Sequence, residues 1–469
     1  VGAGINIIPF MIQRNVPGIG PYVLPAFLFA ALPAILAGLA YAILASAMPR
    51  AGGSYVYASR ALHPYLGFAA SFSQWFGLSI AIGVICYLIV PFLRDVSAAA
   101  GAASLAARLD QGPVRLALAL AILATFVYLN LRGATVYAWT LVPLMVLMFV
   151  LGGVAIVAGL GFDHEQFAAA ALLRDGRPVP RGVEAPFRWS TFFAGASVLF
   201  ASFIGFDAIA QAGGEAKNPR RNLPLAILVA LVTVTGFYMA FAGAVYHAVP
   251  WSYVAREAAT RDLTAPGLLG YLLSPGWTVA IVLGATISLL NDLPGMILSV
   301  SRLVFAWAED GLVPAALAHV HADWRTPHNA ILASGLLAAA GVLGSHYAGD
   351  FFLGVDLLVI SMLVNFLLMC LSVLALPHRN PQLQARVGVS WPRPLQAWLA
   401  SLGALLLAAF LLAHVVKDLA APGRPFYLRS TPVWSLVMLL ATGLYWRATR
   451  RLRAQGVDLR VLSLSLPPE

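Results

Sequence analysis

The stretch FIGFD at residues 203–207 decides how this 469-residue sequence is interpreted. It places Gly205 and Asp207 in the middle of an apolar segment, residues 191–213, that is long enough to cross a membrane. A glycine that interrupts such a helix frees backbone N–H and C=O groups. These groups are tolerated at membrane depth only where they line a cavity or are buried in protein. The stretch therefore predicts a broken helix beside an internal site.

A second interruption lies at the start of the chain, where Gly2, Ala3 and Gly4 precede an apolar run. Residues 1–10 are too short to cross a membrane, so we expect them to be the second half of a first helix that opens before Val1. The two interruptions lie five spans apart, at corresponding positions if spans 1–5 and 6–10 are related halves. Such matched interruptions are typical of the central site of a transporter.

The composition excludes several classes of protein. The chain is 60% hydrophobic and 10% charged, whereas a soluble domain is about 25% charged. A soluble enzyme, a disordered linker and a disulfide-rich secreted module are all excluded. Cys86 and Cys370 both lie in apolar runs, which predicts neither a disulfide framework nor a metal cluster. The net charge of +10 forms no basic face, so we expect no nucleic-acid partner.

Charge-poor stretches bounded by Arg, Asp, Pro or Gly predict twelve spans in an all-α polytopic membrane protein. After the first, they are residues 25–48, 65–93, 114–131, 135–161, 191–213, 223–249, 277–305, 329–346, 351–376, 395–416 and 433–446. We expect a single transmembrane domain over residues 1–469. It contains helices 1–5 to about residue 161, helices 6–10 over about 191–376, helices 11–12 over about 395–446, and a tail from 447 to 469. Residues 163–188 are expected to form a polar loop.

Arginines near the span ends predict the orientation, because cytoplasmic loops carry an excess of Lys and Arg. Arg447, Arg450, Arg451 and Arg453 directly follow the last span. We therefore expect both termini in the cytoplasm and the chain in the cell membrane, where lipids surround it.

Four stretches resemble the amino acid–polyamine–organocation (APC) superfamily. They are GAGI at residues 2–5 with Pro9, MPRAGGSYVY at 48–57, GFD at 205–207 with EAKNPRRNLP at 215–224, and DGLVP at 310–314 with RTP at 325–327. The resemblance implies a 5+5 inverted-repeat fold in which helices 1 and 6 are broken and helices 11 and 12 are appended. It also implies alternating-access transport of amino acids or related amines.

The resemblance also implies a substrate site at the two breaks. Backbone N–H groups would hold the substrate carboxylate, and backbone carbonyls would hold its amine, as the charges of helix ends favour. By position these residues are Gly2, Ala3, Gly4 and Ile5 in helix 1, and Phe200, Ala201, Phe203, Ile204 and Gly205 in helix 6. An α-amino acid carries both charges on one carbon and so fits such a pair of breaks.

The coupling ion stays open, because the chain departs from the pattern of ion-coupled relatives. Pro143 lies near the place where some proton-coupled relatives carry a lysine. Leu290, Asn291 and Asp292 stand where sodium-coupled relatives present small hydroxyl residues. We expect no cofactor beyond a coupling H⁺ or Na⁺ and no bound metal.

Three acids fall within the spans, and intramembrane acids are functional hypotheses by default. Asp292, beside Asn291, predicts a proton or cation site or a counter-charge for a cationic substrate. The alternative is a carboxylate bonded to backbone donors of a neighbouring helix. Asp207 is expected either to cap the second half of helix 6 or to take part in gating or protonation. Asp356 is expected at the membrane interface rather than in the site.

Charges on the cytoplasmic side have two interpretations. They either set the topology as solvated loop residues, or they form an inner gate. The gate hypothesis pairs Glu215 with an arginine of residues 48–60, such as Arg50.

Enzyme motifs such as a zinc-protease helix, a nucleophile elbow or a phosphate loop do not occur in the sequence. The leading hypothesis is secondary active transport of an amino acid or small amine, coupled to an ion gradient or working by exchange. The alternatives are a polyamine or organocation carrier of the same fold, and a receptor or scaffold that binds an amino acid without transporting it. No obligate protein partner is expected.

Overall fold

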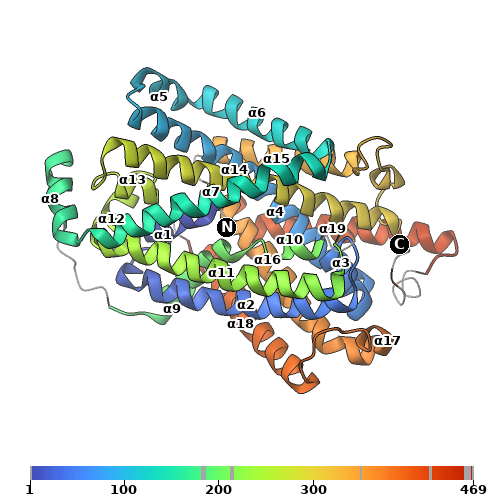
Figure 1. Cartoon of the computed structure of the whole chain (residues 1–469). Helices are drawn as coiled ribbons and strands as arrows, with labels where there is room; N and C mark the ends of the chain where they lie inside the picture. The colour runs from blue at the N-terminus through green and yellow to red at the C-terminus, as the bar shows by residue number, and fades with distance from the viewer. Residues whose placement is uncertain are drawn as a thin grey trace.

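The computed structural model describes residues 3–180, 186–211, 216–348, 351–421, 425–458 and 466, and its described part contains helices and no strand. The long helices run side by side along one axis of the molecule (Figure 1). They are α2 (Val23–Ala47), α4 (Pro64–Ala99), α6 (Gly112–Leu131), α7 (Ala134–Gly161), α11 (Pro219–Ala248), α14 (Pro275–Glu309), α15 (His328–Ala348), α16 (Phe352–Arg379), α18 (Arg393–Ala420) and α19 (Ser430–Ala454).

Two further spans are broken into pieces. Helix 1 consists of η1 (Ala3–Asn6) and α1 (Ile8–Asn15). Helix 6 consists of α9 (Trp189–Leu199), η3 (Phe200–Phe203) and α10 (Asp207–Gln211). The remaining helices are short connectors: η2 (Gly20–Tyr22), α3 (Gly53–Ala61), α5 (Ala103–Leu109), α8 (His164–Asp175), α12 (Trp251–Ala258), α13 (Ala265–Leu269), η5 (Ala315–Ala318), α17 (Pro381–Gln384) and η6 (Phe426–Leu428).

The helices identify the chain as a multi-pass membrane protein. Nine helices of the described residues are long and apolar enough to cross a membrane. Together with the two broken helices and α19, they occupy the twelve predicted positions in order. The outer helices present apolar side chains outward, as Val150 and Val157 of α7 show with exposures of 58% and 72%. Such a surface suits lipid, because a water-soluble protein rarely exposes large contiguous apolar patches.

The packing of the helices follows the predicted 5+5 repeat. Helix 3 (α4) packs on helix 10 (α16), and its counterpart helix 8 (α14) packs on helix 5 (α7). In the same way α4 packs on α15 while α14 packs on α6, and α2 packs on α16 while α11 packs on α7. Each contact therefore recurs when every helix is exchanged for the one five positions away. Since five is odd, the two halves cross the membrane in opposite directions.

The structure also revises several predicted boundaries. The expected polar loop at residues 163–188 contains α8, which begins with a capping box formed by Asp163 and Gln166. Helix 3 continues six residues beyond the predicted end at residue 93, to Ala99. These ends were missed because capping and amphipathic helix turns extend past the apolar core of a span.

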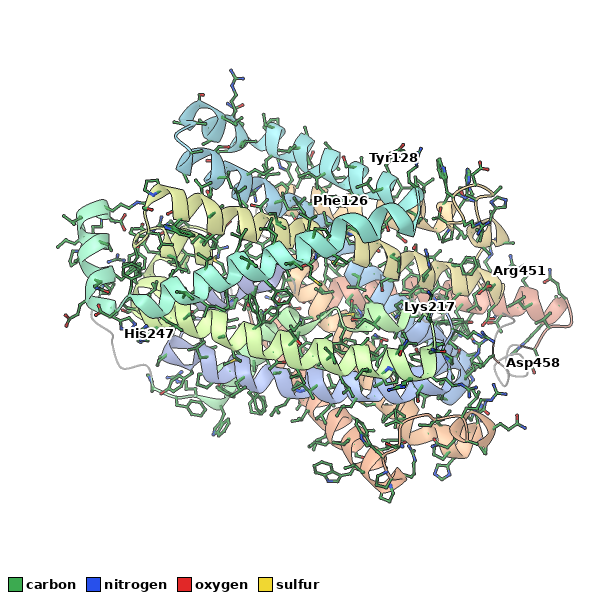
Figure 2. All side chains as sticks on the ribbon, in the orientation of Figure 1. Phe126, Tyr128, Lys217, His247, Arg451 and Asp458 are labelled. Carbon is green, nitrogen blue, oxygen red and sulfur yellow. The ribbon has the colours of Figure 1, made fainter. Side chains whose placement is uncertain are left out.

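The two ends of the bundle carry different elements. Helices α8, α12 and α13 lie at one end, and α3 and the last turns of α19 lie toward the other (Figure 1). Lys217 and Arg451 lie toward the end that holds α3, whereas His247 lies toward the opposite end (Figure 2). We call the end of the bundle that holds α3 the α3 end.

Two glycines allow α4 and α15 to touch backbone to backbone. A Cβ atom added at Gly83 would lie 2.1 Å from the carbonyl oxygen of Ala338, and one at Gly341 would lie 2.4 Å from that of Ile80. Neither backbone atom can move away as a flexible side chain would. The close approach of these two helices therefore requires glycine at both positions.

We predict that Gly83→Ala lowers the thermal stability of the purified protein, because overpacking of this kind costs about 1–3 kcal/mol. Gly153→Ala in α7 is the matched control, since a Cβ there meets no atom within 4 Å. The control is expected to leave the melting temperature unchanged or to raise it, because alanine favours helix. Equal melting temperatures for the two variants would contradict the tight α4–α15 contact.

Candidate functional site

The break in helix 6 depends on one glycine. Ile204 has extended backbone angles, and Gly205 has a φ of +135°, a region that residues with a Cβ rarely adopt. Helical geometry resumes at Asp207, where α10 begins. Residues 204–206 are thus an unwound segment between two helix ends, as the sequence predicts.

The break in helix 1 lies directly against the break in helix 6. The 3₁₀ turn η1 ends at Asn6, Ile7 leaves helical geometry with a φ of −130°, and α1 begins at Ile8. A Cβ added at Gly4 would lie 3.3 Å from Oγ of Ser202 and 3.4 Å from its Cα. The 3₁₀ turns η1 and η3, which border the two breaks, therefore meet, and a side chain at Gly4 would push them apart.

Both breaks line one cavity of about 520 Å³. Its wall is formed by pieces of helices 1, 3, 5, 6, 7, 8 and 10. The predicted site residues that line it are Gly4, Ala201, Phe203, Ile204, Gly205, Asp207, Asn291 and Asp292. Two of the described lining residues are acidic and none is basic. The structure thus brings most of the predicted site residues together, on a wall that carries only negative charge.

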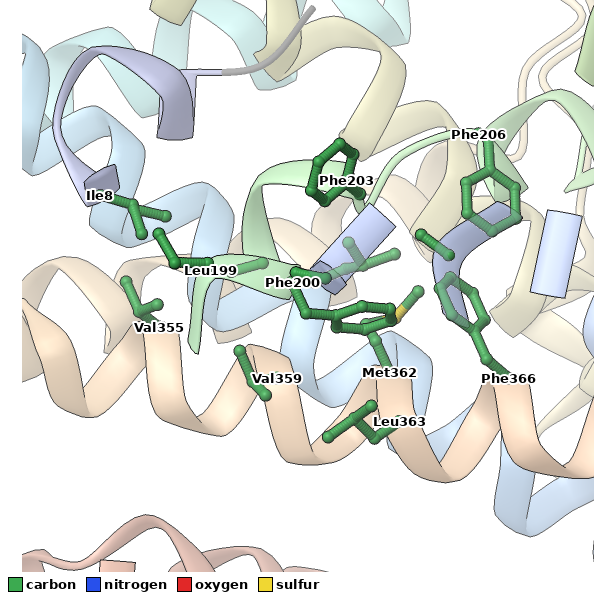
Figure 3. Close-up of a cluster of buried hydrophobic side chains, with 14 of the residues drawn as sticks. Ile8, Leu199, Phe200, Phe203, Phe206, Val355, Val359, Met362, Leu363 and Phe366 are labelled. Atoms are coloured by element: carbon green, nitrogen blue, oxygen red, sulfur yellow. The ribbon is translucent and has the colours of Figure 1, made fainter. Parts of the chain in front are cut away.

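Other predicted residues lie elsewhere. Ile5 lines a separate small cavity of about 20 Å³ together with Asn6 and Ser288. The side chain of Phe200 is fully buried and packs against Phe366 and Phe410, with ring centroids 6.0 and 6.2 Å apart. Figure 3 shows Phe200 within this buried cluster, on the side of helix 6 that faces α16. The Phe200 side chain is therefore part of the packing, while the roles predicted for the backbone of Ile5 and Phe200 stay predictions.

Two predicted positions are described incompletely or not at all. Gly2 lies outside the described residues, and of Ala3 only the backbone is described, as the first residue of η1. Their predicted contacts with a substrate carboxylate stay predictions.

Asp207 connects the break to the interior of the protein. Its side chain is 1% exposed, and its Oδ1 accepts a hydrogen bond of 3.2 Å from the backbone N–H of Gly205. Its Oδ2 accepts a hydrogen bond from Nε2 of Gln74 in α4. The carboxylate therefore satisfies a peptide group of the unwound segment, and it also contacts helix 3. The capping of the second half of helix 6 by Asp207 stays a prediction. Gln74 was missed by the sequence analysis, although it is a buried amide in an apolar span.

Charged groups form a buried pair at the α3 end. Nη1 of Arg60 lies 2.9 Å from Oδ2 of Asp310, and the side chains are only 1% and 9% exposed. The hydroxyl of Tyr55 donates a hydrogen bond to the same carboxylate oxygen. Burial would lower the pKa of Arg60, but the neighbouring Asp310 and Tyr55 outweigh it and raise this pKa. Arg60 therefore stays charged, and it ties α3 to the residue that follows α14.

This pair differs from the predicted inner gate. Arg60 belongs to the predicted segment, residues 48–60, but its carboxylate partner here is Asp310. Glu215 lies outside the described residues, and Arg50 lies in the turn before α3. The pairing of Arg50 with Glu215 stays a prediction. Asp310 was missed as a partner because it is 250 residues from Arg60 in the sequence.

Asp356 lies away from the cavity lining, as expected, and it is buried near the start of α16. It is 1% exposed, and its Oδ1 lies 2.9 Å from Nζ of Lys417 in α18. Helix 11 covers this side of helix 10 and supplies a lysine that the spacing of the spans does not indicate. The position of Asp356 at the membrane interface stays a prediction.

The opposite end of helix 1 is also fixed. Nη2 of Arg14 lies 2.8 Å from Oδ1 of Asp262, which follows α12, and Pro9 accepts a hydrogen bond of 2.7 Å from the hydroxyl of Tyr246. Both groups of the ion pair are partly exposed. Half-helix α1 is thus joined to the loop between α12 and α13.

The comparison with known proteins fits this geometry. The sequence model of a family described as amino acid permease matches residues 1–443. The chain belongs to the amino acid permease family. The family is one of membrane transporters and not of enzymes, which agrees with the sequence prediction.

Three curated relatives of this permease illustrate the range of the family. The chain is similar to human cationic amino acid transporter 4, with 29% identity over 72% of the chain and 52% of the relative. It is 30% identical to the vacuolar cationic amino acid transporter 4 of Arabidopsis thaliana, over 72% of the chain and 55% of the relative. It is 25% identical to the methylthioribose transporter of Bacillus subtilis (strain 168), over 82% of the chain and 79% of the relative. The chain spans about half the length of the cationic amino acid transporters that it matches.

We predict that Arg60→Gln destabilises the permease by about 3–5 kcal/mol, because it leaves the buried Asp310 carboxylate without its cation. Chemical or thermal unfolding in lipid nanodiscs measures this. Arg94→Gln is the matched control, since Arg94 pairs with Asp95 and Asp110 at the surface with 34% of its side chain exposed. The Arg94→Gln control is expected to lower the free energy of unfolding by at most about 1 kcal/mol. If Arg60→Gln lowered the free energy of unfolding as little as the control does, a structural role of the Arg60–Asp310 pair would be contradicted.

Proposed function

We propose that this permease is a secondary active transporter that moves an amino acid or related small amine by alternating access. The observation that carries the proposal is that both helix breaks line the same cavity. One break offers the N–H groups at the start of η1, where Gly4 lines the cavity, and the other offers the carbonyls at the end of η3. A zwitterion placed between them meets the positive end of one half-helix and the negative end of the other.

We propose further that the substrate is cationic. Asp207 and Asp292 both line the cavity, and no described lining residue carries a positive charge. In a site of low dielectric constant, a carboxylate favours a cationic group over a neutral one. The printed names of several relatives, cationic amino acid transporters, agree with this choice. A polyamine would also meet the acids, but it has no carboxylate for the N–H groups of helix 1.

The cavity is large enough for such a substrate. Binding pockets for small molecules usually measure about 300–1,000 Å³, and this one measures about 520 Å³. Its polar groups gather at the breaks and around Asn291 and Asp292, while Phe203, Phe206 and Met296 add apolar surface. This distribution suits a substrate with charged ends and an aliphatic chain, such as lysine or arginine.

We propose that the chain lies in the cell membrane with both termini in the cytoplasm and takes H⁺ or Na⁺ as its coupling ion. The arginines in the last turns of α19 support this orientation, because positive charges collect on the cytoplasmic side. In this orientation the α3 end faces the cytoplasm. Lipids would cover the exposed apolar faces of α6 and α7.

Uptake by proteoliposomes tests the proposal. Labelled lysine, arginine, leucine, putrescine and methylthioribose are offered with a proton gradient and a sodium gradient imposed separately. We expect accumulation of lysine or arginine with one of the two gradients. Binding of lysine without accumulation would indicate the receptor alternative, and failure to move any of the five solutes would contradict the proposal.

We predict that Asp292→Asn lowers uptake of the cationic substrate relative to leucine by roughly tenfold to a hundredfold. The reason is that a hydrogen bond to a charged group contributes about 1.5–3 kcal/mol. Asp110→Asn is the control, because Asp110 is 63% exposed and lies outside the cavity lining. An unchanged lysine-to-leucine ratio in Asp292→Asn would show that Asp292 does not select the substrate.

A further inference from the structure

A chain of buried polar side chains leads from the cavity to α3. Its members are Asp207 in α10, Gln74 in α4, Ser54 in α3 and Gln211 in α10, all between 0% and 1% exposed. Of the four, only Asp207 lines the cavity. Buried polar groups are costly unless their hydrogen bonds are made, so a network of this kind has few stable arrangements.

The hydrogen bonds run in one direction when Asp207 is ionised. Gln74 donates through Nε2 to Oδ2 of Asp207. Its Oε1 accepts one hydrogen bond from the hydroxyl of Ser54 and another, of 3.2 Å, from Nε2 of Gln211. Oε1 of Gln211 is buried and has no partner among the described residues. The arrangement thus satisfies the carboxylate and leaves one acceptor unused at the far end.

A proton on Asp207 reverses this direction. The protonated carboxyl group is a donor and needs an acceptor, whereas the NH₂ group of Gln74 offers only donors. Rotation of the Gln74 amide brings its Oε1 to the proton and turns its NH₂ group toward Ser54 and Gln211. Ser54 can then accept, and Gln211 can rotate so that its unused Oε1 accepts. One proton is therefore sufficient to turn both amides.

The far end of the network holds α3 in place. A Cβ added at Gly53 would lie 2.6 Å from Oε1 of Gln211, so the start of α3 fits closely against this amide. Gly52, with a φ of +88°, provides the turn that leads into α3. Tyr55, next to Ser54, hydrogen-bonds to Asp310, which pairs with Arg60. A change at Ser54 and Gln211 thus acts on the helix that carries Tyr55 and Arg60.

We propose that Gln74 is a positioning residue. It transmits the protonation of Asp207 to α3, and through α3 to the Arg60–Asp310 ion pair at the α3 end. The inference rests on the proposed transport function, in which the cavity opens in turn to either side of the membrane. In the ionised state α3 is held by the hydrogen bond from Ser54 to the Gln74 amide, and this amide is polarised by its charge-assisted hydrogen bond to Asp207. The protonated state holds α3 through neutral hydrogen bonds, which are weaker. Protonation therefore loosens α3.

Other titratable groups face the same region and could also respond to pH. Tyr41 of α2 interacts electrostatically with Asp207, lies next to Ser54 and accepts a hydrogen bond of 2.7 Å from Asn365. Asp292 of α14 and Tyr238 of α11 line the same cavity. A pH response that persists without the Gln74 amide would belong to these groups.

The first test measures amide hydrogen exchange of α3 in lipid nanodiscs without substrate, in acidic and in weakly alkaline buffer, corrected for the intrinsic effect of pH. We expect faster exchange in α3 at acidic pH in the wild type. The NH₂ group of Asn in Asp207→Asn is a hydrogen-bond donor, as a protonated carboxyl group is. The amides of α3 should therefore exchange fast at both pH values in this variant. In Gln74→Leu the exchange should no longer depend on pH.

The second test measures the pH profile of uptake for the same variants. Coupling between sites commonly amounts to about 5- to 150-fold, so the uptake ratio between the two pH values should fall at least about fivefold in Gln74→Leu. Gln396→Leu is the matched control, because Gln396 is also buried but bonds to the carbonyl of Trp391 in another part of the protein. It should keep the wild-type profile.

The outcomes separate the two proposals. Suppose that the wild type transports its substrate and that Gln74→Leu keeps the wild-type pH profile of uptake and of amide hydrogen exchange in α3. The role proposed for Gln74 is then wrong, while the proposed transport function stands. If the wild type transports nothing, transport is wrong, and the exchange measurement still decides whether α3 follows the protonation of Asp207. If Gln74→Leu fails to fold, Gln211→Leu takes its place, because it removes the last acceptor of the network and should also flatten the pH response.

Discussion

A helix that is interrupted inside the hydrocarbon layer releases peptide groups that need hydrogen-bond partners, and the centre of this permease depends on that requirement. At the break in helix 6, the carboxylate of Asp207 accepts the N–H of Gly205. The other released groups border a cavity shared with the break in helix 1. The hydrogen bonding of these peptide groups thus creates a polar, acidic site inside a bundle whose outer helices expose apolar side chains. Glycine is needed at Gly205 for its positive φ and at Gly4 for the close approach of η1 to η3.

The charges around this centre are arranged in layers. Asp207 and Asp292 lie at the cavity, the Arg60–Asp310 pair lies at the α3 end, and the Arg14–Asp262 pair joins helix 1 to the loop after α12. The Arg60–Asp310 pair is nearly inaccessible, whereas Arg14 and Asp262 are partly exposed. The structure thus has one buried ion pair at the α3 end and one partly exposed ion pair that joins helix 1 to the loop after α12.

The sequence predicted the parts of this arrangement that depend on local chemistry. Glycine at an interruption, an acid beside it, and the lengths of the spans all follow from the residues themselves, so the breaks, Asp207 and Asp292 were found. Gln74 and Asp310 were not, because their importance comes from partners 133 and 250 residues away. The pairing of Asp356 with Lys417 was missed for the same reason, since only the packing of helix 11 on helix 10 brings Lys417 to it. Span lengths also could not reveal the turns that caps add to helix ends.

The most direct test of a substrate site between the two breaks is a cryo-EM structure of the protein in lipid nanodiscs at saturating concentration of a transported amino acid. The substrate carboxylate is expected within about 3 Å of backbone N–H groups at the start of η1, such as that of Gly4. The substrate amine is expected at the carbonyls of η3, and the side chain should extend toward Asp292. Substrate density outside the cavity bounded by Gly4 and Gly205, with that cavity free of it, would contradict the central role of the breaks.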